Sequence, residues 1–452
     1  MEHLGSLSRE ELIQIILDQH RMVERLRAEI EQLKRRSGAA PFSKGTRKPN
    51  PKRPGRKPGQ GFFRFRNPPE QAADVEPVNV PVDVQCCPDC GGRLGEGRRE
   101  IVSITDIPAQ PQPEVRRYAV ETRDCGECGR KVRGQHPGIA PGQQGATAHR
   151  VGPHVKALAH ILHYVHGVPV RKTPAIIEDL TGVRLTQGAI TQDAMKQSND
   201  AVGATYKALR ALVQDQPVVH TDDTGWRVGG AAAFLMAFVN PWLSVYQVRP
   251  QHRNEEVREL IPAHFGGVMV CDRGRSYDAV ELKEVAQQKC LAHLIRNAST
   301  VAEAKTGRAK QFSEQLKEIL QQALGLAAEK NGIAAADYWQ RVEELDDQLT
   351  FHLRDRVLHD EDNQRLLNGM GAQHDKGHVL RFLGEEGLEP TNNRAERDLR
   401  PAVIARKVSH CSRNERGARA LEAFTSVLQT IRKTNPLEVV ATLVKLISSA
   451  PT

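Results

Sequence analysis

The stretch of residues 217–228, PVVHTDDTGWRV, constrains the fold of this chain more than any other. Its apolar, β-branched beginning predicts a buried central strand, and Asp222 and Asp223 place two adjacent carboxylates at the end of that strand. A polar strand end followed by a Thr-Gly turn is the simplest interpretation of this stretch taken alone. The other interpretation is that the two carboxylates bind a partner, because charged groups at the end of a buried strand are costly without one. Later parts of the chain decide between these two interpretations.

Two later stretches carry further acids. Residues 266–272, GGVMVCD, form a second apolar run closed by Asp272, and residues 389–401, EPTNNRAERDLRP, place Glu396 on a predicted short helix. Hard divalent cations bind oxygen ligands, and a pair of them bridges the attacking and leaving oxygens of a phosphoryl transfer. Three carboxylates on separate elements are what such a pair requires. Asp222, Asp272 and Glu396 are therefore the candidate catalytic residues and magnesium ligands.

The helical period of residues 392–400 predicts which way Glu396 faces. Asn392, Glu396 and Arg400 fall on one face, and Ala395 and Leu399 fall on the other. Glu396 is thus expected to point away from the core, although an ordinary surface Glu-Arg pair would give the same pattern. Basic residues of this region that could hold DNA phosphates are Arg400, Arg406 and Lys407.

The order of elements predicts an α/β catalytic domain over residues 213–300 and 385–415. After the first strand come two apolar runs, 231–240 and 243–248, then an amphipathic helix near 254–260 and the strand ending at Asp272. Three strands, a helix and a fourth strand, with acids ending the first and fourth, is the ribonuclease H-like order. Residues 290–293, CLAH, are expected on a fifth strand, as a packed cysteine and a hydrogen-bonded histidine. Residues 301–384 are predicted to form a helical insertion, and residues 416–452 two closing helices.

Length and charge limit the number of domains and the kinds of partner that this chain can have. At 452 residues the chain is too long for one core, and its net charge of +9 is local, because residues 34–66 contain twelve Lys or Arg and no acid. No apolar run approaches the roughly 18 residues that span a bilayer, and the N-terminus lacks a signal-peptide core. We therefore expect a soluble cytoplasmic protein, associated with the nucleoid, without a membrane partner. Its eight cysteines suggest metal binding or packing instead of disulfides.

The N-terminal part of the chain predicts self-association and DNA contact. Residues 1–36 carry an apolar heptad stripe typical of a short coiled coil, which favours a homo-oligomer, although a helix packed on its own domain is the alternative. Residues 37–80 form a basic linker rich in Pro and Gly. Four of its cations lie on an extended backbone that fits a narrow minor groove, namely Lys52, Arg53, Arg56 and Lys57. A solvated tether is the competing interpretation of this linker.

Two Cys-x-x-Cys knuckles predict a small β-rich zinc-binding domain over residues 81–145. Their four thiolates, Cys87, Cys90, Cys125 and Cys128, complete a tetrahedral site, and four ligands leave no open position, so the Zn²⁺ is expected to be structural. Residues 146–212 then follow a helical period and include a helix-turn-helix-like pair. Thr186 and Gln187 would begin its second helix, where a recognition helix contacts bases, although a purely structural helix pair remains an alternative.

The order of the knuckles and of the motifs HTDDTGWRV, CDRGRSYD, CLAHLIR and EPTNNRAERDLRP resembles the transposases of the insertion sequence 66 family over nearly the whole chain. The resemblance implies a DDE transposase with a ribonuclease H-like catalytic domain. Its triad falls on Asp222, Asp272 and Glu396, and its cofactors would be two Mg²⁺ or Mn²⁺ ions. Asp223 occupies the second acidic place of the family, whereas Gly274 stands where many relatives carry an aromatic residue.

The implied function is binding of the element's ends, followed by metal-dependent DNA cleavage and strand transfer. The implied partners are DNA and, in some relatives, accessory proteins encoded by the element. Two other functions fit parts of the same pattern. A ribonuclease H-like nuclease would keep the three acids and lack strand transfer, and a catalytically inactive DNA-binding regulator would need no acids at all.

Overall fold

The computed structural model describes residues 151–354, 357–409 and 411–448, most of 113–139 together with residue 143, and residues 84–86 and 88–93; before these it describes residue 76 and a few positions between 14 and 26. Residues 14, 18, 19, 21–23 and 26 of the predicted coiled coil are helical and exposed. The other residues of the predicted coiled coil lie outside the described residues, as does the basic linker apart from residue 76, so its four candidate DNA contacts are not described. The chain divides into two compact units, Met1–Ala109 and Gln110–Thr452.

The second unit begins with a two-stranded antiparallel hairpin of β1 (Thr122–Asp124) and β2 (Lys131–Arg133). The second cysteine knuckle forms the connection between these strands, and Gly129 there has a φ of 68°, which an L side chain rarely adopts. The predicted β-rich segment between the knuckles is described only from residue 113 onward, and residues 113–121 form no strand.

Helices cover residues 153–212 as their period predicts. They are α2 (Pro153–Tyr164), α3 (Thr173–Thr181), α4 (Gln187–Gln197) and α5 (Ala201–Leu212). Helix α3 ends at Gly182, which has a φ of 69°. Helix α4 begins after Thr186, whose Oγ1 accepts a hydrogen bond from Ala189 N at 3.2 Å and so caps the helix. The α3–turn–α4 pair therefore lies where the sequence places it.

The central sheet has five strands in the order β5-β4-β3-β6-β7. Their bounds are β3 Val218–Val228, β4 Ala231–Val239, β5 Ser244–Arg249, β6 Val268–Cys271 and β7 Ala286–Lys289, with α6 (Asn254–Arg258) between β5 and β6. Strands β3, β4 and β5 are antiparallel neighbours, whereas β6 runs parallel to β3 and β7 parallel to β6. The predicted succession of three strands, a helix and a fourth strand is thus present.

Two predicted elements differ from the structure. The fifth strand is Ala286–Lys289, and Cys290 precedes helix α7 (Leu291–Glu303), so residues 290–293 form a helix start instead of a strand. The sequence AQQK has no apolar strand signal, and it becomes a strand because its parallel pairing with β6 and tertiary hydrogen bonds satisfy its buried amides. The predicted short Glu-bearing helix is longer than expected, since α12 (Asn393–Ser409) continues through Pro401.

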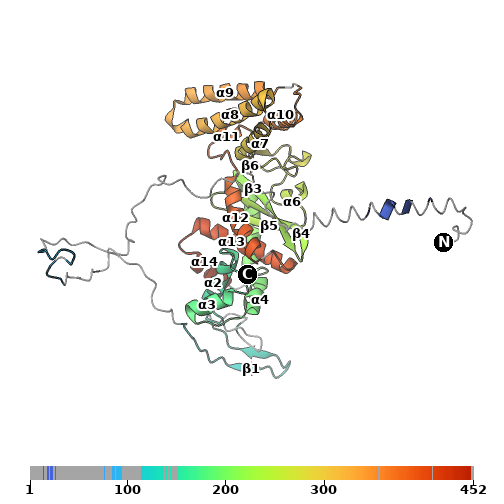
Figure 1. Ribbon diagram of the computed structural model, residues 1–452. Coiled ribbons are helices and arrows are strands. Elements are labelled where there is room, and N and C mark those ends of the chain that lie inside the picture. The colour runs from blue at the N-terminus through green and yellow to red at the C-terminus, as the bar shows by residue number, and fades with distance from the viewer. Residues whose placement is uncertain are drawn as a thin grey trace, which may run out of the picture. The chain divides into compact units, whose positions relative to one another are not determined.

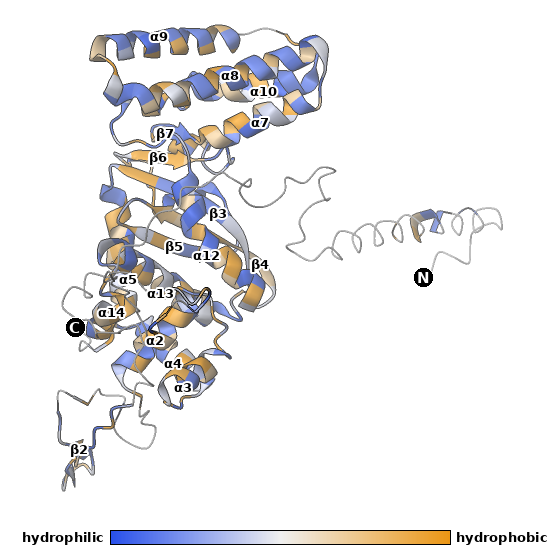
Figure 2. Cartoon of the chain, turned by 60° about the vertical axis from the view of Figure 1, so that its left-hand side comes forward, coloured by the Kyte–Doolittle hydropathy of each residue, from blue (hydrophilic) through white to orange (hydrophobic). Residues whose placement is uncertain are grey.

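The remaining helices follow β7 in the chain. They are α8 (Gly307–Glu329), α9 (Ala335–His352), α10 (Glu361–His374), α11 (Arg381–Gly384), α13 (Glu415–Thr434) and α14 (Val439–Ser448). Short 3₁₀ turns lie at Val213–Asp215, Val280–Leu282 and Lys330–Gly332. In Figures 1 and 2, helices α8, α9 and α10 lie together beyond the β6 side of the sheet, while α2, α3 and α4 lie at the opposite end of this unit. The helical insertion and the helix pair are therefore held apart by the sheet.

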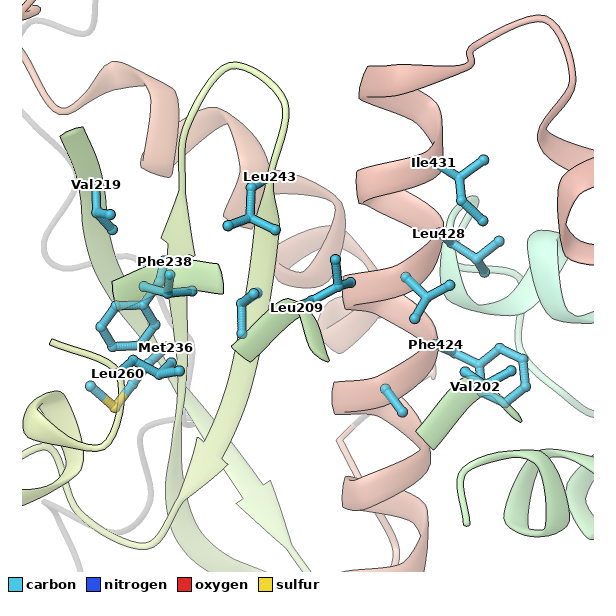
Figure 3. Packing of buried hydrophobic residues seen from close by; sticks show 14 of the residues in the cluster. Val202, Leu209, Val219, Met236, Phe238, Leu243, Leu260, Phe424, Leu428 and Ile431 are labelled. Atoms are coloured by element: carbon cyan, nitrogen blue, oxygen red, sulfur yellow. The ribbon is translucent and has the colours of Figure 1, made fainter. Parts of the chain in front are cut away.

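Alternation along β4 separates two cores on the two faces of the sheet. Met236 and Phe238 belong to a cluster that includes Leu260 and residues of α5 and α13, such as Leu209 and Phe424 (Figure 3). Leu235, Ala237 and Val239 face the other way, where they join Ala395, Leu399 and Ala402 of α12. The two-residue period of the strand thus assigns α13 to one face and α12 to the other. A third cluster joins Val268 and Val270 of β6 to the helical insertion.

Helix α13 also closes the edge of the sheet at β5. Glu422 Oε1, Ser426 Oγ and Thr430 Oγ1 accept hydrogen bonds from Val248 N, Tyr246 N and Ser244 N at 2.7, 2.9 and 3.1 Å. A four-residue step along a helix rises about 6 Å and a two-residue step along a strand about 6.7 Å, so the two spacings match over three bonds. Backbone donors that an edge strand would leave open are thereby satisfied by one helix.

Candidate active site

Asp222 lies within β3, and Asp272 directly follows β6, the neighbouring parallel strand. The sequence predicted that β3 would end at Asp222 and Asp223 before a Thr-Gly turn, but pairing with β4 continues the strand through Thr224 and Gly225 to Val228. Strands β3 and β6 pair in the register Val218↔Val268, Val219↔Met269 and His220↔Val270. Each aspartate lies two residues beyond the last of these pairs, so the register brings both carboxylates to the same level of the sheet. This placement follows from the apolar runs that precede each acid, because those runs form the buried part of each strand.

Helix α12 carries Glu396 and is tied to β3 at both ends. Asn392 Nδ2, just before the helix, donates to Thr221 O at 2.7 Å, and Arg406 Nη1 donates to Thr224 Oγ1 at 2.8 Å and to Gly225 O. Between these anchors Ala395 and Leu399 are buried against the sheet, as their helical period predicts. Since the anchored residues of β3 flank Asp222, the helix is held along the part of the strand that bears this carboxylate.

The acids influence one another electrostatically. Burial, together with the negative charges of Asp223, Asp272 and Glu396, raises the pKa of Asp222 to about 7, although a backbone hydrogen bond at Asp223 opposes the rise. Carboxylate oxygens that repel one another suit a hard divalent cation, which offsets their charge. Within the part of the chain that the structure describes, no three His, Cys, Asp or Glu side chains gather as a ready-made metal site.

The loop after Asp272 is fixed by a buried lysine and a glycine. Lys289 Nζ, fully buried, lies 2.8 Å from Asp278 Oδ1 and donates to Asp272 O at 3.1 Å. Gly274 N donates to Asp272 Oδ1 at 2.7 Å, and a Cβ on Gly274 would lie only 2.9 Å from that oxygen and 3.2 Å from the Tyr277 ring. The glycine at this position is therefore required by the loop, and an aromatic side chain would not fit it.

Asp223 has a partner that the sequence did not indicate. His252 Nδ1 lies 2.8 Å from Asp223 Oδ1, and its Nε2 lies 3.2 Å from Ser276 Oγ. Burial lowers the pKa of His252, but the hydrogen bond and charge of Asp223 outweigh burial and the net pKa is raised. This histidine connects the end of β3 to the loop that follows Asp272. Asp223 is thus held by a histidine.

His293 is a second residue that pattern reasoning assigned only to packing. It lies in the first turn of α7, with Nε2 3.6 Å from Glu396 Oε1, and a hydrogen bond that it donates to the Cys290 thiolate raises its pKa although burial lowers it. An open pocket of about 280 Å³ adjoins it, lined by Asp272, Arg273, Gly274, His293 and Asn297. The spacing Cys-x-x-His was the available signal, and its proximity to Glu396 depends on the tertiary fold.

The predicted DNA-binding residues fall into different environments. Arg400 and Lys407 are exposed on α12, and Thr186 and Gln187 are exposed at the start of α4. Arg406 is buried against β3, where its guanidinium anchors the helix as described above. The structure therefore leaves four of these five side chains accessible from solvent.

The cysteine knuckles are described only in part. Cys125 and Cys128 lie in the β1–β2 connection, and hydrogen bonds from the backbone of Cys128 and Glu127, together with the Cys128 thiol, lower the pKa of Cys125. A lowered pKa favours the thiolate form that binds zinc. Cys90 belongs to the first unit, and Cys87 lies outside the described residues.

Comparison with known proteins gives one match. The model of the family described as "Transposase IS66 family" matches residues 149–420, a range that includes the three acids and the α3–α4 pair. No curated protein matches the chain. None of the helices among the described residues is long and apolar enough to cross a membrane.

Proposed function

The chain belongs to the IS66 family of transposases, and from this premise we propose that it binds the ends of an insertion sequence and catalyses DNA cleavage and strand transfer. The catalytic residues of this proposal are Asp222, Asp272 and Glu396, within a ribonuclease H-like DDE domain. The sheet order β5-β4-β3-β6-β7, with acids directly after or within β3 and β6, supports that domain type.

The observation that carries the proposal is that carboxylates from three separate elements lie near enough for the charges of Asp272 and Glu396 to act on Asp222. Parallel pairing of β3 with β6 brings Asp222 level with Asp272, and the two anchors of α12 on β3 hold Glu396 near them. The charges of Asp272 and Glu396 both contribute to the raised pKa of Asp222. A regulator that only binds DNA has no use for three partly buried carboxylates that repel one another.

Asp222 and Asp272 are the proposed principal ligands of a pair of Mg²⁺ or Mn²⁺ ions, and Glu396 completes the set. Such ions, when bound, activate water and stabilise charge on the attacking and leaving oxygens of a phosphodiester. The remaining residues orient these ligands: Lys289 holds the main chain of Asp272, and Asn392 holds the start of α12.

DNA is the proposed partner, and several regions are proposed to contact it. Exposed Arg400 and Lys407 would meet phosphates, Thr186 and Gln187 would meet bases, and the basic linker would lie along the minor groove. A structural Zn²⁺ held by the four knuckle cysteines, self-association through residues 1–36 and element-encoded accessory proteins belong to the same proposal.

The test is replacement of each acid by its amide. We expect Asp222→Asn, Asp272→Asn and Glu396→Gln each to abolish cleavage and joining while DNA binding survives, because each change removes one anionic ligand and several kcal/mol of charge stabilisation. The matched control is Glu284→Gln, an exposed acid in the segment between β6 and β7. Near-normal turnover in Glu396→Gln would assign the third ligand to another residue.

Supplying pre-cut ends with a free 3′-hydroxyl separates the proposal from its alternatives. A joined product supports the transposase, and hydrolysis without joining supports a nuclease of the same fold. Binding with neither reaction, in protein loaded with Mg²⁺ or Mn²⁺, indicates a regulator.

A further inference from the structure

Arg273 is a half-buried cation without an anionic partner at bonding distance. Among the residues that the structure describes, no side chain forms an ion pair with its guanidinium, and its buried Nε has no hydrogen-bond acceptor. By contrast, Arg249 of the same unit binds both oxygens of Glu259 and one of Glu422. A buried charge left unpaired is costly, so an arginine in this state is suited to an anion that arrives from outside.

The position of the Arg273 side chain is defined by the helical insertion. Its guanidinium lies over Gly369 of α10, where a Cβ on the glycine would come within 2.9 Å of Arg273 Nη1. The absence of a side chain at Gly369 therefore makes the space that the guanidinium occupies. This contact connects the loop after β6 to an element about a hundred residues later in the chain.

The pocket beside Arg273 has the polarity of a phosphodiester site. Its volume is about 280 Å³, and Asp272 lines it together with the donors Arg273, His293 and Asn297. A metal ligand and a cation on adjacent residues face the same space. A phosphodiester bears negative charge, so it can bind the Arg273 guanidinium, whose planar donors match two of its oxygens. The same phosphodiester can also bind a divalent cation held by Asp272.

We propose that Arg273 binds the phosphodiester at the cleavage site of the DNA, beside Asp272 and under the helical insertion. The inference rests on the proposed transposase function and adds to it a substrate-binding residue outside the acidic triad. In this proposal Arg273 positions the phosphate at the end of the insertion sequence and binds its negative charge.

The test is a double-mutant cycle that combines a substitution in the protein with a chemical change of one phosphate in the DNA. The probe is a duplex that spans one end of the insertion sequence encoding this chain, either unmodified or with a neutral methylphosphonate at the cleavage position. Binding is measured without added Mg²⁺ or Mn²⁺, so that the readout is independent of catalysis and the proposed structural Zn²⁺ is not removed by a chelator. We expect the methylphosphonate to weaken binding to the unaltered full-length chain about 10- to 100-fold, the range of one hydrogen bond to a charged group.

We expect the Arg273→Gln variant to bind the unmodified duplex about 10- to 100-fold more weakly than the unaltered chain does. For this variant, replacing the unmodified duplex by the methylphosphonate duplex should weaken binding little further. The control is Arg275→Gln, which removes an exposed arginine two residues away, and this variant should keep the full sensitivity to the methylphosphonate. Gly369→Ala, which keeps the charge and displaces the guanidinium, should reduce that sensitivity partly. If Arg273→Gln did not fold, Arg273→Lys would serve, because an ammonium keeps the charge and loses the fork.

Equal sensitivity to the methylphosphonate in Arg273→Gln and in the unaltered chain would overturn the inference. Failure of the transposase proposal has a different signature, since the unaltered chain would then neither cut nor join this duplex in Mg²⁺, whatever the binding cycle showed.

Discussion

At the scale of single residues, the buried polar groups around β7 have consequences for stability. His378 is almost fully buried, its main-chain oxygen accepts a hydrogen bond from Lys289 N at 2.7 Å, and its Nδ1 lies 3.1 Å from Gln373 Oε1. Burial, followed by the charges of Lys289, Arg381 and Lys376, lowers the pKa of His378 to about 4. The folded protein therefore holds this imidazole neutral, whereas an unfolded histidine has a pKa of about 6.5.

This difference predicts a loss of stability in mild acid. Because the folded pKa is depressed, the unfolded chain binds more protons between about pH 6.5 and pH 4, and stability falls as the pH falls through that window. Between pH 7 and pH 5 the contribution is about 1 to 2 kcal/mol after allowance for solvent screening. Denaturant titrations at both pH values should show a smaller loss in His378→Asn, whose amide can replace Nδ1. An identical loss in both proteins would exclude His378 as a source.

At the scale of elements, α13 stabilises the sheet by bonding to its edge as well as by packing. Thr430 Oγ1 both accepts from Ser244 N and donates to Ser244 O, at 3.1 Å each, and Ser244 is fully buried. The helix thereby takes the place of a sixth strand. An open edge would expose a row of unpaired backbone groups to other chains.

Removing this bond without changing volume tests the role of the helix. Thr430→Val should lower the free energy of unfolding by about 1 to 3 kcal/mol, because it leaves the buried amide and carbonyl of Ser244 without partners. The control is Thr434→Val, the same substitution at an exposed position of the same helix. Denaturant unfolding measures both, and light scattering should show faster aggregation only in Thr430→Val. Equal stability of the two variants would mean that packing alone holds α13.

At the scale of the whole molecule, positive charge is concentrated in residues 34–66, outside the proposed catalytic domain. Residues 34–66 hold twelve Lys or Arg and no acid, while the net charge of the chain is +9, so the remainder is slightly acidic. Sequence-independent attraction to DNA is therefore predicted to depend on this tract.

Deletion of residues 44–66 should flatten the dependence of DNA affinity on salt. Each phosphate contact contributes about 0.9 to the double-logarithmic slope, and since the nine cations that this deletion removes cannot all engage at once, we expect the slope to fall by roughly three to six units. Specific and non-specific binding should weaken together, because phosphate contacts carry little base information. Titrations at several salt concentrations measure the slope. An unchanged slope would identify the tract as a solvated tether and would transfer recognition to the α3–α4 pair.

The sequence by itself determined the elements whose signals are local. Apolar runs located β3 through β6, because a buried strand needs continuous apolar side chains, and the acids at the ends of two runs located Asp222 and Asp272. The alternation of buried and exposed positions in α12 followed from helical period, and Ala395 and Leu399 are buried as that period requires. The turn at residues 181–183 was predicted from Gly182, and helix α3 ends at this residue.

Only the tertiary structure decided features that depend on partners distant in the chain. The polar sequence AQQK became β7 because buried contacts with residues such as Val379 and Phe382 satisfy its amides. Arg406, which resembled a phosphate contact, became an anchor because β3 presents oxygens to it, and α12 continued through Pro401 between its two anchors. The partner of Asp223, the proximity of His293 to Glu396 and the place of Arg273 over Gly369 arise in the same way, since a side chain's chemistry is local but its neighbours are set by the packing of the whole unit.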